Sequence, residues 1–140
     1  MPTLRILPFE DADLTLIPMA GRRALDAAGR KLSLRGWQQL SLLAREAIVS
    51  LGAEAEVDVE RVRDLIAAAS PPAEPIASPA EPPEHAPSEE VEAVLGSVPG
   101  WAALPPVARY ALHSYARRGK HDKLRAAYAS MSSGASQSTR

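Results

Sequence analysis

Apolar residues recur three and four positions apart along most of the chain, which is the spacing that places side chains on one face of a helix. The stripe of Val59, Val62, Leu65 and Ile66 follows Asp58, which predicts a helix with an aspartate N-cap. The pattern and its stop signals predict helices over residues 18–28, 35–40, 42–51, 58–69 and 89–95, within 100–117, and around Leu124 and Tyr128. Residues 4–9 form a short apolar run that predicts an extended arm.

One sequence motif within this pattern occurs twice, 64 residues apart. The identical positions are Gly36, Trp37, Leu40, Ala44, Arg45 and Ala47, which recur as Gly100, Trp101, Leu104, Ala108, Arg109 and Ala111. Conservative matches in the same register are Leu34 with Val98, Leu43 with Val107 and Ile48 with Leu112. The repeat indicates a duplicated structural unit in which a short helix runs into a longer one. Ser41 and Pro105 occupy matching positions, and both residue types suit the start of a helix.

A proline-rich segment separates the two copies, with seven prolines within residues 71–87. The predicted organisation is an N-terminal helical unit over 1–69, a disordered acidic linker over 70–88, a second helical unit over 89–129 and a disordered tail over 130–140. About forty residues are too few to hold a stable core alone. We therefore expect the second unit to pack on the first, with Trp37 and Trp101 in a shared core.

Composition favours an all-α fold, a compact helical domain built from the two Trp-containing units. The 140 residues are 46% hydrophobic but include only two Trp, three Tyr and one Phe, so closely packed helices are expected rather than sheet. No apolar run is long enough to span a membrane and no signal peptide is recognisable, which predicts a cytoplasmic protein. The chain has no Cys, which excludes thiolate catalysis and thiolate metal ligands. We expect no cofactor.

Charge is unevenly distributed although the formal net charge is only −1. All six charged residues within 70–100 are glutamates, whereas residues 101–140 hold seven basic side chains and one acidic one. The basic cluster consists of Arg117, Arg118, Lys120, Lys123 and Arg125. It could meet an acidic partner surface or nucleic acid, but a solvated helix end is the safer interpretation, because cations suit helix C-termini.

Candidate chemistry is sparse. His85 lies in the predicted linker, and the eight-residue spacing of His113 and His121 does not place both imidazoles on one helical turn, so no metal site is expected. The chain lacks a glycine-rich phosphate loop and a nucleophile elbow, and we predict no catalytic residues and no enzyme activity. The repeated Arg45 and Arg109 could bind an anion, but a helical Arg beside a Trp more often tethers a carbonyl or carboxylate.

Several ordered residues resemble the nitrate reductase associated proteins of cyanobacteria and some other bacteria. The matching positions are Phe9-Glu10, Leu16-Ile17-Pro18-Met19, Arg22 or Arg23, Leu25-Asp26, Gly29, Lys31-Leu32-Ser33-Leu34, Trp37, Leu40-Ser41 and Arg45, followed by Trp101, Leu104, Arg109-Tyr110-Ala111-Leu112 and His121-Asp122. The run Ile17-Pro18-Met19 with Leu25-Asp26 and Trp37 is the most specific part. The family pattern has a Cys just before Ile-Pro-Met, where this chain has Leu16.

The resemblance implies a small, non-catalytic accessory protein that supports the activity or maturation of an assimilatory nitrate reductase, a molybdenum and iron–sulfur enzyme, by binding it. The candidate partner-binding residues are Arg22, Asp26, Trp37, Arg45, Arg109, Arg117 and Arg118. Met19, Leu25 and Leu34 are assigned to the core. Two alternatives stay open: a small nucleic-acid-binding helical domain that uses the basic cluster, which the near-neutral total charge disfavours, and a scaffold module without a reductase partner.

Overall fold

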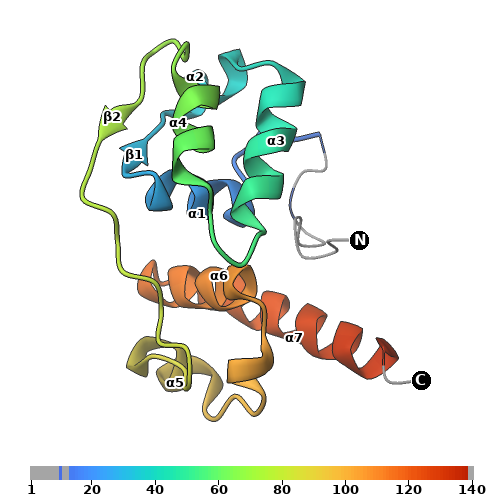
Figure 1. Ribbon diagram of the computed structural model, residues 1–140. Helices are drawn as coiled ribbons and strands as arrows, with labels where there is room; N and C mark the ends of the chain where they lie inside the picture. The colour runs from blue at the N-terminus through green and yellow to red at the C-terminus, as the bar shows by residue number, and fades with distance from the viewer. Residues whose placement is uncertain (1–9, 11–12, 139–140) are drawn as a thin grey trace. The chain divides into compact units, whose positions relative to one another are not determined.

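The computed structural model describes residue 10 and residues 13–138, with side chains as far as residue 132. The chain divides into two compact units, unit 1 over Met1–Ala80 and unit 2 over Glu81–Arg140. Most of both units is helical, and the described residues also form one sheet of two short strands (Figure 1). Unit 1 contains α1 (Met19–Ala27), β1 (Arg30–Lys31), α2 (Leu34–Gln39), α3 (Leu42–Gly52), α4 (Val59–Ile66) and β2 (Glu74–Pro75). Unit 2 contains α5 (Glu89–Leu95), the 3-10 turn η2 (Trp101–Ala103), α6 (Pro106–Arg117) and α7 (His121–Ser138).

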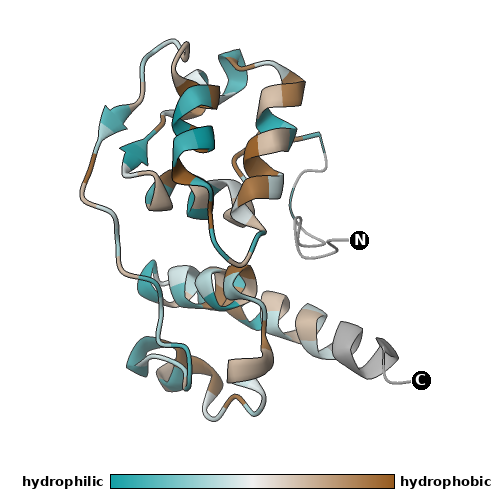
Figure 2. Cartoon of the chain, viewed as in Figure 1, coloured by the Kyte–Doolittle hydropathy of each residue, from teal (hydrophilic) through white to brown (hydrophobic). Residues whose placement is uncertain are grey.

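A close approach of α1 and α3 organises unit 1. A Cβ atom added at Gly52, the last residue of α3, would stand 1.7 Å from the carbonyl oxygen of Ala20 in α1, so only glycine allows this crossing. Hydrophobic positions run along α3 on either side of a short hydrophilic band (Figure 2). The buried hydrophobic residues of the unit are Leu14, Met19, Ala20, Ala24, Leu25, Ala28, Leu32, Trp37, Leu40, Ile48, Val49, Val62, Ile66 and Ala69.

Short-range sequence signals fix several helix starts. The Ser41 hydroxyl accepts a hydrogen bond from the Ala44 N–H at 3.1 Å, and the Asp58 carboxylate accepts one from the Arg61 N–H at 3.2 Å. Each side chain therefore satisfies a backbone donor that the first turn leaves unpaired. Pro105 stands at the N-cap of α6, where its fixed φ suits the helix start. These three starts confirm the predictions made from residue type.

The start of α1 uses a residue from outside the helix. Its N-cap, Pro18, makes no side-chain capping bond, but the Glu10 carboxylate accepts a hydrogen bond from the Met19 N–H at 2.7 Å. A carboxylate at this end also complements the positive end of the helix dipole. The helix ends before Gly29, whose φ of +68° matches the predicted glycine stop.

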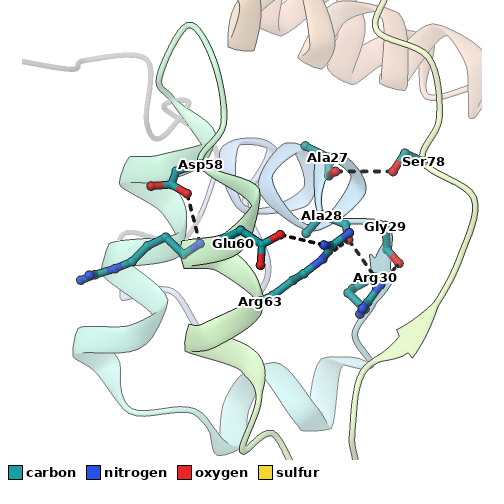
Figure 3. Close-up of polar contacts among 9 residues, drawn as sticks. Ala27, Ala28, Gly29, Arg30, Asp58, Glu60, Arg63 and Ser78 are labelled. Carbon is teal, nitrogen blue, oxygen red and sulfur yellow. Dashed lines mark hydrogen bonds and ion pairs between the residues drawn. The ribbon is translucent and has the colours of Figure 1, made fainter.

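Side chains from three segments satisfy the carbonyl groups at the end of α1 (Figure 3). The donors are the Ser78 hydroxyl to Ala27 at 3.4 Å, the Arg63 Nε to Ala28 at 3.1 Å and the Arg30 Nη1 to Gly29 at 2.9 Å. The same Arg63 is also paired with Glu60, one turn earlier on α4, at 3.0 Å. The C-terminus of α1 is thereby tied to α4, β1 and the segment after β2.

Part of the proline-rich segment belongs to unit 1. Strand β2 pairs antiparallel with β1, with Arg30 opposite Pro75 and Lys31 opposite Glu74, and the Ile76 N–H donates to the Gly29 carbonyl at 2.9 Å. Pro75 has no N–H to contribute, but a two-stranded ladder at a sheet edge tolerates that loss. The sequence predicted an entirely helical fold with a disordered linker over 70–88, so these strands correct the fold class to mostly helical.

Unit 2 is built on α6, which packs against both α5 and α7. Its buried hydrophobic residues are Val91, Val98, Trp101, Val107, Ala108, Tyr110, Ala111, Leu112, Tyr115, Ala116, Leu124, Ala127 and Met131. The sequence predicted a disordered tail over 130–140, but α7 continues to Ser138, and residues 139–140 lie outside the described chain. The helical spacing of Leu124, Ala127 and Met131, all buried, accounts for the continuation past residue 130.

The core assignments made from sequence hold at two of three positions. Met19 and Leu25 are both 4% exposed, whereas Leu34 is 45% exposed and is not a core residue. Leu34 is the first residue of α2, and that helix buries Gly36 and Trp37 instead. The predicted extended arm over residues 4–9 lies outside the described residues. None of the helices in the described chain is both long and apolar enough to span a membrane.

Candidate partner-binding surfaces

Trp37 and Arg45 hold the same turn of unit 1. The Trp37 indole N–H and the Arg45 Nη1 both donate to the Leu14 carbonyl, at 2.8 and 3.0 Å. Leu14 is buried and has a φ of +60°, a left-handed conformation that is uncommon outside glycine. The Gln38 side-chain amide donates to the next carbonyl, that of Thr15, at 3.1 Å. Side chains from α2 and α3 therefore fix two consecutive peptide groups of this turn.

Trp101 and Arg109 also donate hydrogen bonds to backbone carbonyls in unit 2, but they bind different carbonyls. The Trp101 indole N–H donates to the Pro83 carbonyl at 2.8 Å. The Arg109 Nη1 donates to the Leu104 carbonyl at 2.5 Å and to the Ala102 carbonyl at 3.3 Å, which secures the connection from η2 to α6. In both units an indole N–H reaches a preceding segment and a helical arginine binds backbone carbonyls, which confirms the tethering interpretation of the two arginines.

The internal contacts decide what Trp37, Arg45 and Arg109 can offer a partner. Trp37 is 0% exposed, so it has no surface for another molecule to touch. Arg109 is 9% exposed. Arg45 is half-buried, and its Nε is a buried atom without a hydrogen-bond partner. Trp37 can therefore act on a partner only through the segments that it positions, whereas Arg45 and Arg109 each use their guanidinium group for an internal hydrogen bond.

On α1 the deeply buried arginine is Arg23, which the sequence analysis did not separate from Arg22. Arg23 is 3% exposed and donates to the carbonyls of the chain just after α3, at Gly52 (2.8 Å), Glu54 (2.5 Å) and Ala55 (2.9 Å). The candidates Arg22 and Asp26 are both half-buried. Spacing from Met19 does not distinguish the two arginines, because residues three and four positions later both lie on its side of the helix, so no short-range signal identified Arg23.

The remaining two candidates, Arg117 and Arg118, belong to an exposed basic corner where α6 ends and α7 begins. We define the basic corner as Arg117, Arg118, Lys120, Lys123 and Arg125, all of which are exposed. Asp122 supplies one counter-charge, in an ion pair with Arg125 at 3.6 Å whose side chains are 57% (Arg125) and 107% (Asp122) exposed. An exposed pair of this kind contributes little to stability. The corner is therefore a surface of concentrated positive charge.

A second exposed feature, on unit 1, was not expected from the sequence. Unit 1 has four exposed leucines, Leu16, Leu34, Leu42 and Leu43, whose exposed fractions are 52%, 45%, 50% and 79%. The only other exposed large hydrophobic side chain in the described chain is Ile76, at 38%. A helical stripe in the sequence indicates which residues share a face, but it cannot say whether that face meets the core or the solvent.

Ser88 and His113 form a polar contact inside unit 2. The Ser88 hydroxyl lies 2.9 Å from the His113 Nδ1 and caps α5 by accepting from the Val91 N–H at 3.4 Å. Burial lowers the pKa of His113; Glu90 opposes this shift and Arg117 adds to it. The hydrogen bond between the serine hydroxyl and the imidazole joins the start of α5 to α6. Among the described residues, no three His, Asp or Glu side chains gather as a metal-binding group.

Together these features define a class: a small, mostly helical protein whose tryptophans and several of whose arginines hold internal segments in place, and whose surface carries a cluster of exposed cations and several exposed leucines. The sequence model of the family described as conserved nitrate reductase-associated protein matches residues 9–130, so the chain belongs to that family. The resemblance found from single residues is thereby confirmed. The family description is consistent with an accessory role. Neither the curated proteins nor the solved structures gave a match.

Proposed function

We propose that this protein is a non-catalytic cytoplasmic accessory protein that supports the activity or maturation of an assimilatory nitrate reductase by binding it. Family membership over residues 9–130 supports the choice of partner. The observation that carries a binding role is the basic corner, where five cations are exposed at the junction of α6 and α7 and one of them, Arg125, is ion-paired with Asp122. Charge concentrated in this way steers an oppositely charged protein surface and accelerates its association.

We infer that the two Trp-containing motifs descend from a duplicated unit. In support, the elements follow the same order in each unit, with α1, α2, α3 and α4 in the first and α5, η2, α6 and α7 in the second. Each unit also has a buried Trp whose indole donates to a backbone carbonyl.

The test is capture of the reductase from the protein's own organism grown on nitrate. A tagged full-length chain should recover nitrate reductase, identified by mass spectrometry, and Arg118→Glu should reduce the recovery several-fold by reversing one charge of the basic corner. Arg61→Glu is the matched control, because Arg61 is likewise exposed but lies on α4. Failure of the wild-type chain to recover the reductase would contradict the proposal.

A nucleic-acid-binding module is the second candidate function, favoured by the same basic corner. Phosphate contacts by these five side chains would make binding fall steeply as salt is raised. Stacking on bases has less support, because Trp37, Trp101, Tyr110 and Tyr115 are all buried. Salt-sensitive retention of nucleic acid together with no retention of the reductase would favour this candidate over the accessory role.

A further inference from the structure

An acidic residue of α5 lies beside the basic corner of unit 2. The Ser88 hydroxyl, at the N-cap of α5, lies 2.9 Å from the His113 Nδ1 on α6. Glu90 follows Ser88 in the first turn of α5, and Arg117, the first residue of the basic corner, lies one helical turn after the histidine on α6. The contact between the serine and the histidine therefore brings Glu90 and Arg117 to the same imidazole from two different helices.

The electrostatics of His113 show that both charges reach it. Burial is the main cause that lowers the pKa of His113, Glu90 opposes this shift and Arg117 adds to it. The two side chains thus act on one ring with opposite signs, and both are exposed. A partner that covers the basic corner at Arg117 therefore has the carboxylate of Glu90 at the edge of its contact.

Glu92, in the same turn of α5, does not share this position. Val91 lies between the two glutamates in the sequence and is 0% exposed, so it faces the core of unit 2. Each glutamate stands about 100° from Val91 around the helix axis, in opposite directions. Glu90 and Glu92 are therefore exposed on opposite sides of α5, and of the two it is Glu90 that acts on His113.

The negative charge at this edge changes which partners the basic corner accepts. A nucleic acid presents a continuous row of phosphates, so a strand that lies along the five cations brings like charge towards Glu90. A protein surface can instead place a Lys or Arg against Glu90 and carboxylates against the cations. Complementary patterns of this kind favour the correct partner, and like charges placed opposite each other suppress the wrong one. The edge carboxylate therefore favours a protein surface of mixed charge over a nucleic acid.

We propose that Glu90 is a specificity-determining residue of the basic corner, which selects a reductase surface that carries a cationic side chain beside a group of carboxylates. This inference rests on the proposed function and deepens it, because it names the charge pattern of the partner surface. The carboxylate of Glu90 pairs with that cationic side chain while the basic corner binds the carboxylates. The same carboxylate weakens the binding of nucleic acid.

Binding of the purified, cofactor-loaded reductase and of a fluorescent oligothymidine strand to the full-length chain tests the proposal. Glu90→Gln should weaken reductase binding several-fold, mainly through slower association at low salt, and should strengthen binding of the strand several-fold. Glu92→Gln is the matched control, because it removes the same charge from the opposite side of the same turn. Glu90→Asp keeps the charge and should bind both molecules as wild type. All three variants should keep the wild-type circular dichroism spectrum, because both glutamates are exposed.

Each outcome decides between the two proposals. If the wild-type chain binds the reductase and Glu90→Gln binds it equally or more tightly, the reductase offers no cation to Glu90 and this proposal fails, while the accessory role stands. Equal losses in Glu90→Gln and Glu92→Gln would also overturn it, because they would reflect net charge rather than position. A strand that binds Glu90→Gln no more tightly than wild type would overturn the discrimination against nucleic acid. If the wild-type chain does not bind the reductase, the proposed function fails and this proposal falls with it.

Discussion

Unit 1 and unit 2 contain the same short sequence motif but differ in how far they bury its apolar side chains. Both bury the tryptophan, at 0% exposure for Trp37 and 2% for Trp101, and both place an arginine eight residues later against backbone carbonyls. The flanking apolar positions diverge, since Leu43 is 79% exposed where Val107 is 2% exposed. The shared tryptophan and arginine therefore form local hydrogen bonds that anchor backbone carbonyls. The helices packed around them determine which apolar side chains are buried.

The same comparison extends to how closely the helices approach. Gly52 ends α3 against the backbone of Ala20, and Ala116, 64 residues later, is buried near the end of α6. Unit 1 thus requires the absence of a methyl group at a position where unit 2 accommodates one. Matching sequence positions do not imply matching packing, and variants at paired positions can measure the difference.

Removing either tryptophan ring should give the largest loss of stability. Trp37→Ala and Trp101→Ala each empty a buried site and remove an indole hydrogen bond, so each should lower the free energy of unfolding by about 3–5 kcal/mol. Urea unfolding followed by circular dichroism measures the loss. Gln39→Ala, on the same helix as Trp37 and exposed, serves as the control. A loss below about 1 kcal/mol in either variant would show that the ring does not anchor its unit.

Adding one methyl group should distinguish the two units. Gly52→Ala places a Cβ within 1.7 Å of a backbone oxygen that cannot rotate away, so α1 and α3 must separate. Overpacking of this kind costs about 1–3 kcal/mol or more. The reverse change at the matched position, Ala116→Gly, should cost only about 1 kcal/mol through the lower helix propensity of glycine. Thermal unfolding of both variants checks this order, and an unchanged midpoint for Gly52→Ala would contradict the close crossing.

Much of the fold could be predicted because its signals are local. Ser41 and Asp58 cap the helices that they precede. The tryptophan and arginine of each motif bind backbone carbonyls, as their residue types favour. The family was likewise recognisable from the order of a few residues, including Ile17-Pro18-Met19 and Trp37, and the family match over residues 9–130 confirms it.

The features that sequence reasoning missed depend on neighbours distant along the chain. The ladder between Arg30–Lys31 and Glu74–Pro75 spans two residues on each side, too short to show an alternating pattern. Leu43 and Val107 look alike in the sequence, and only the packing around α3 and α6 makes one a surface residue and the other a core residue. The exposure of the four leucines of unit 1 could not be foreseen for this reason, whereas the basic corner could, because charged side chains are exposed by default.

The two tethering arginines should differ in their contribution to stability. Arg109 is 9% exposed and serves two carbonyls, whereas Arg45 is half-buried and serves one that Trp37 also reaches. We expect Arg109→Met to lower the free energy of unfolding by about 2 kcal/mol and Arg45→Met by about 1 kcal/mol, because the first removes the donor to two carbonyls, whereas Trp37 still donates to the Leu14 carbonyl in the second. Urea unfolding compares them, with Arg61→Met as an exposed control. Equal losses would contradict this assignment.

The smallest expected effect is a pH dependence confined to unit 2, since all three histidines of the chain lie within it. The pKa of His113 is lowered from its ordinary value of 6.5, chiefly by burial, so the folded state favours the neutral ring. The unfolded chain then binds the proton more readily than the folded one, and stability should fall as the pH drops through 6.5 and level off below the folded pKa.

Thermal unfolding between pH 7.5 and 5 measures this dependence. His113→Asn should flatten the stability curve over that range, because the titrating group is gone while Ser88 retains a polar neighbour. His121→Asn is the control, since His121 is exposed at the start of α7 and should leave the slope unchanged. If the slope survives in His113→Asn, another group titrates there. A flatter slope for this variant alone would tie the pH response to the contact that joins α5 to α6, a contact that unit 1, without a histidine, cannot form.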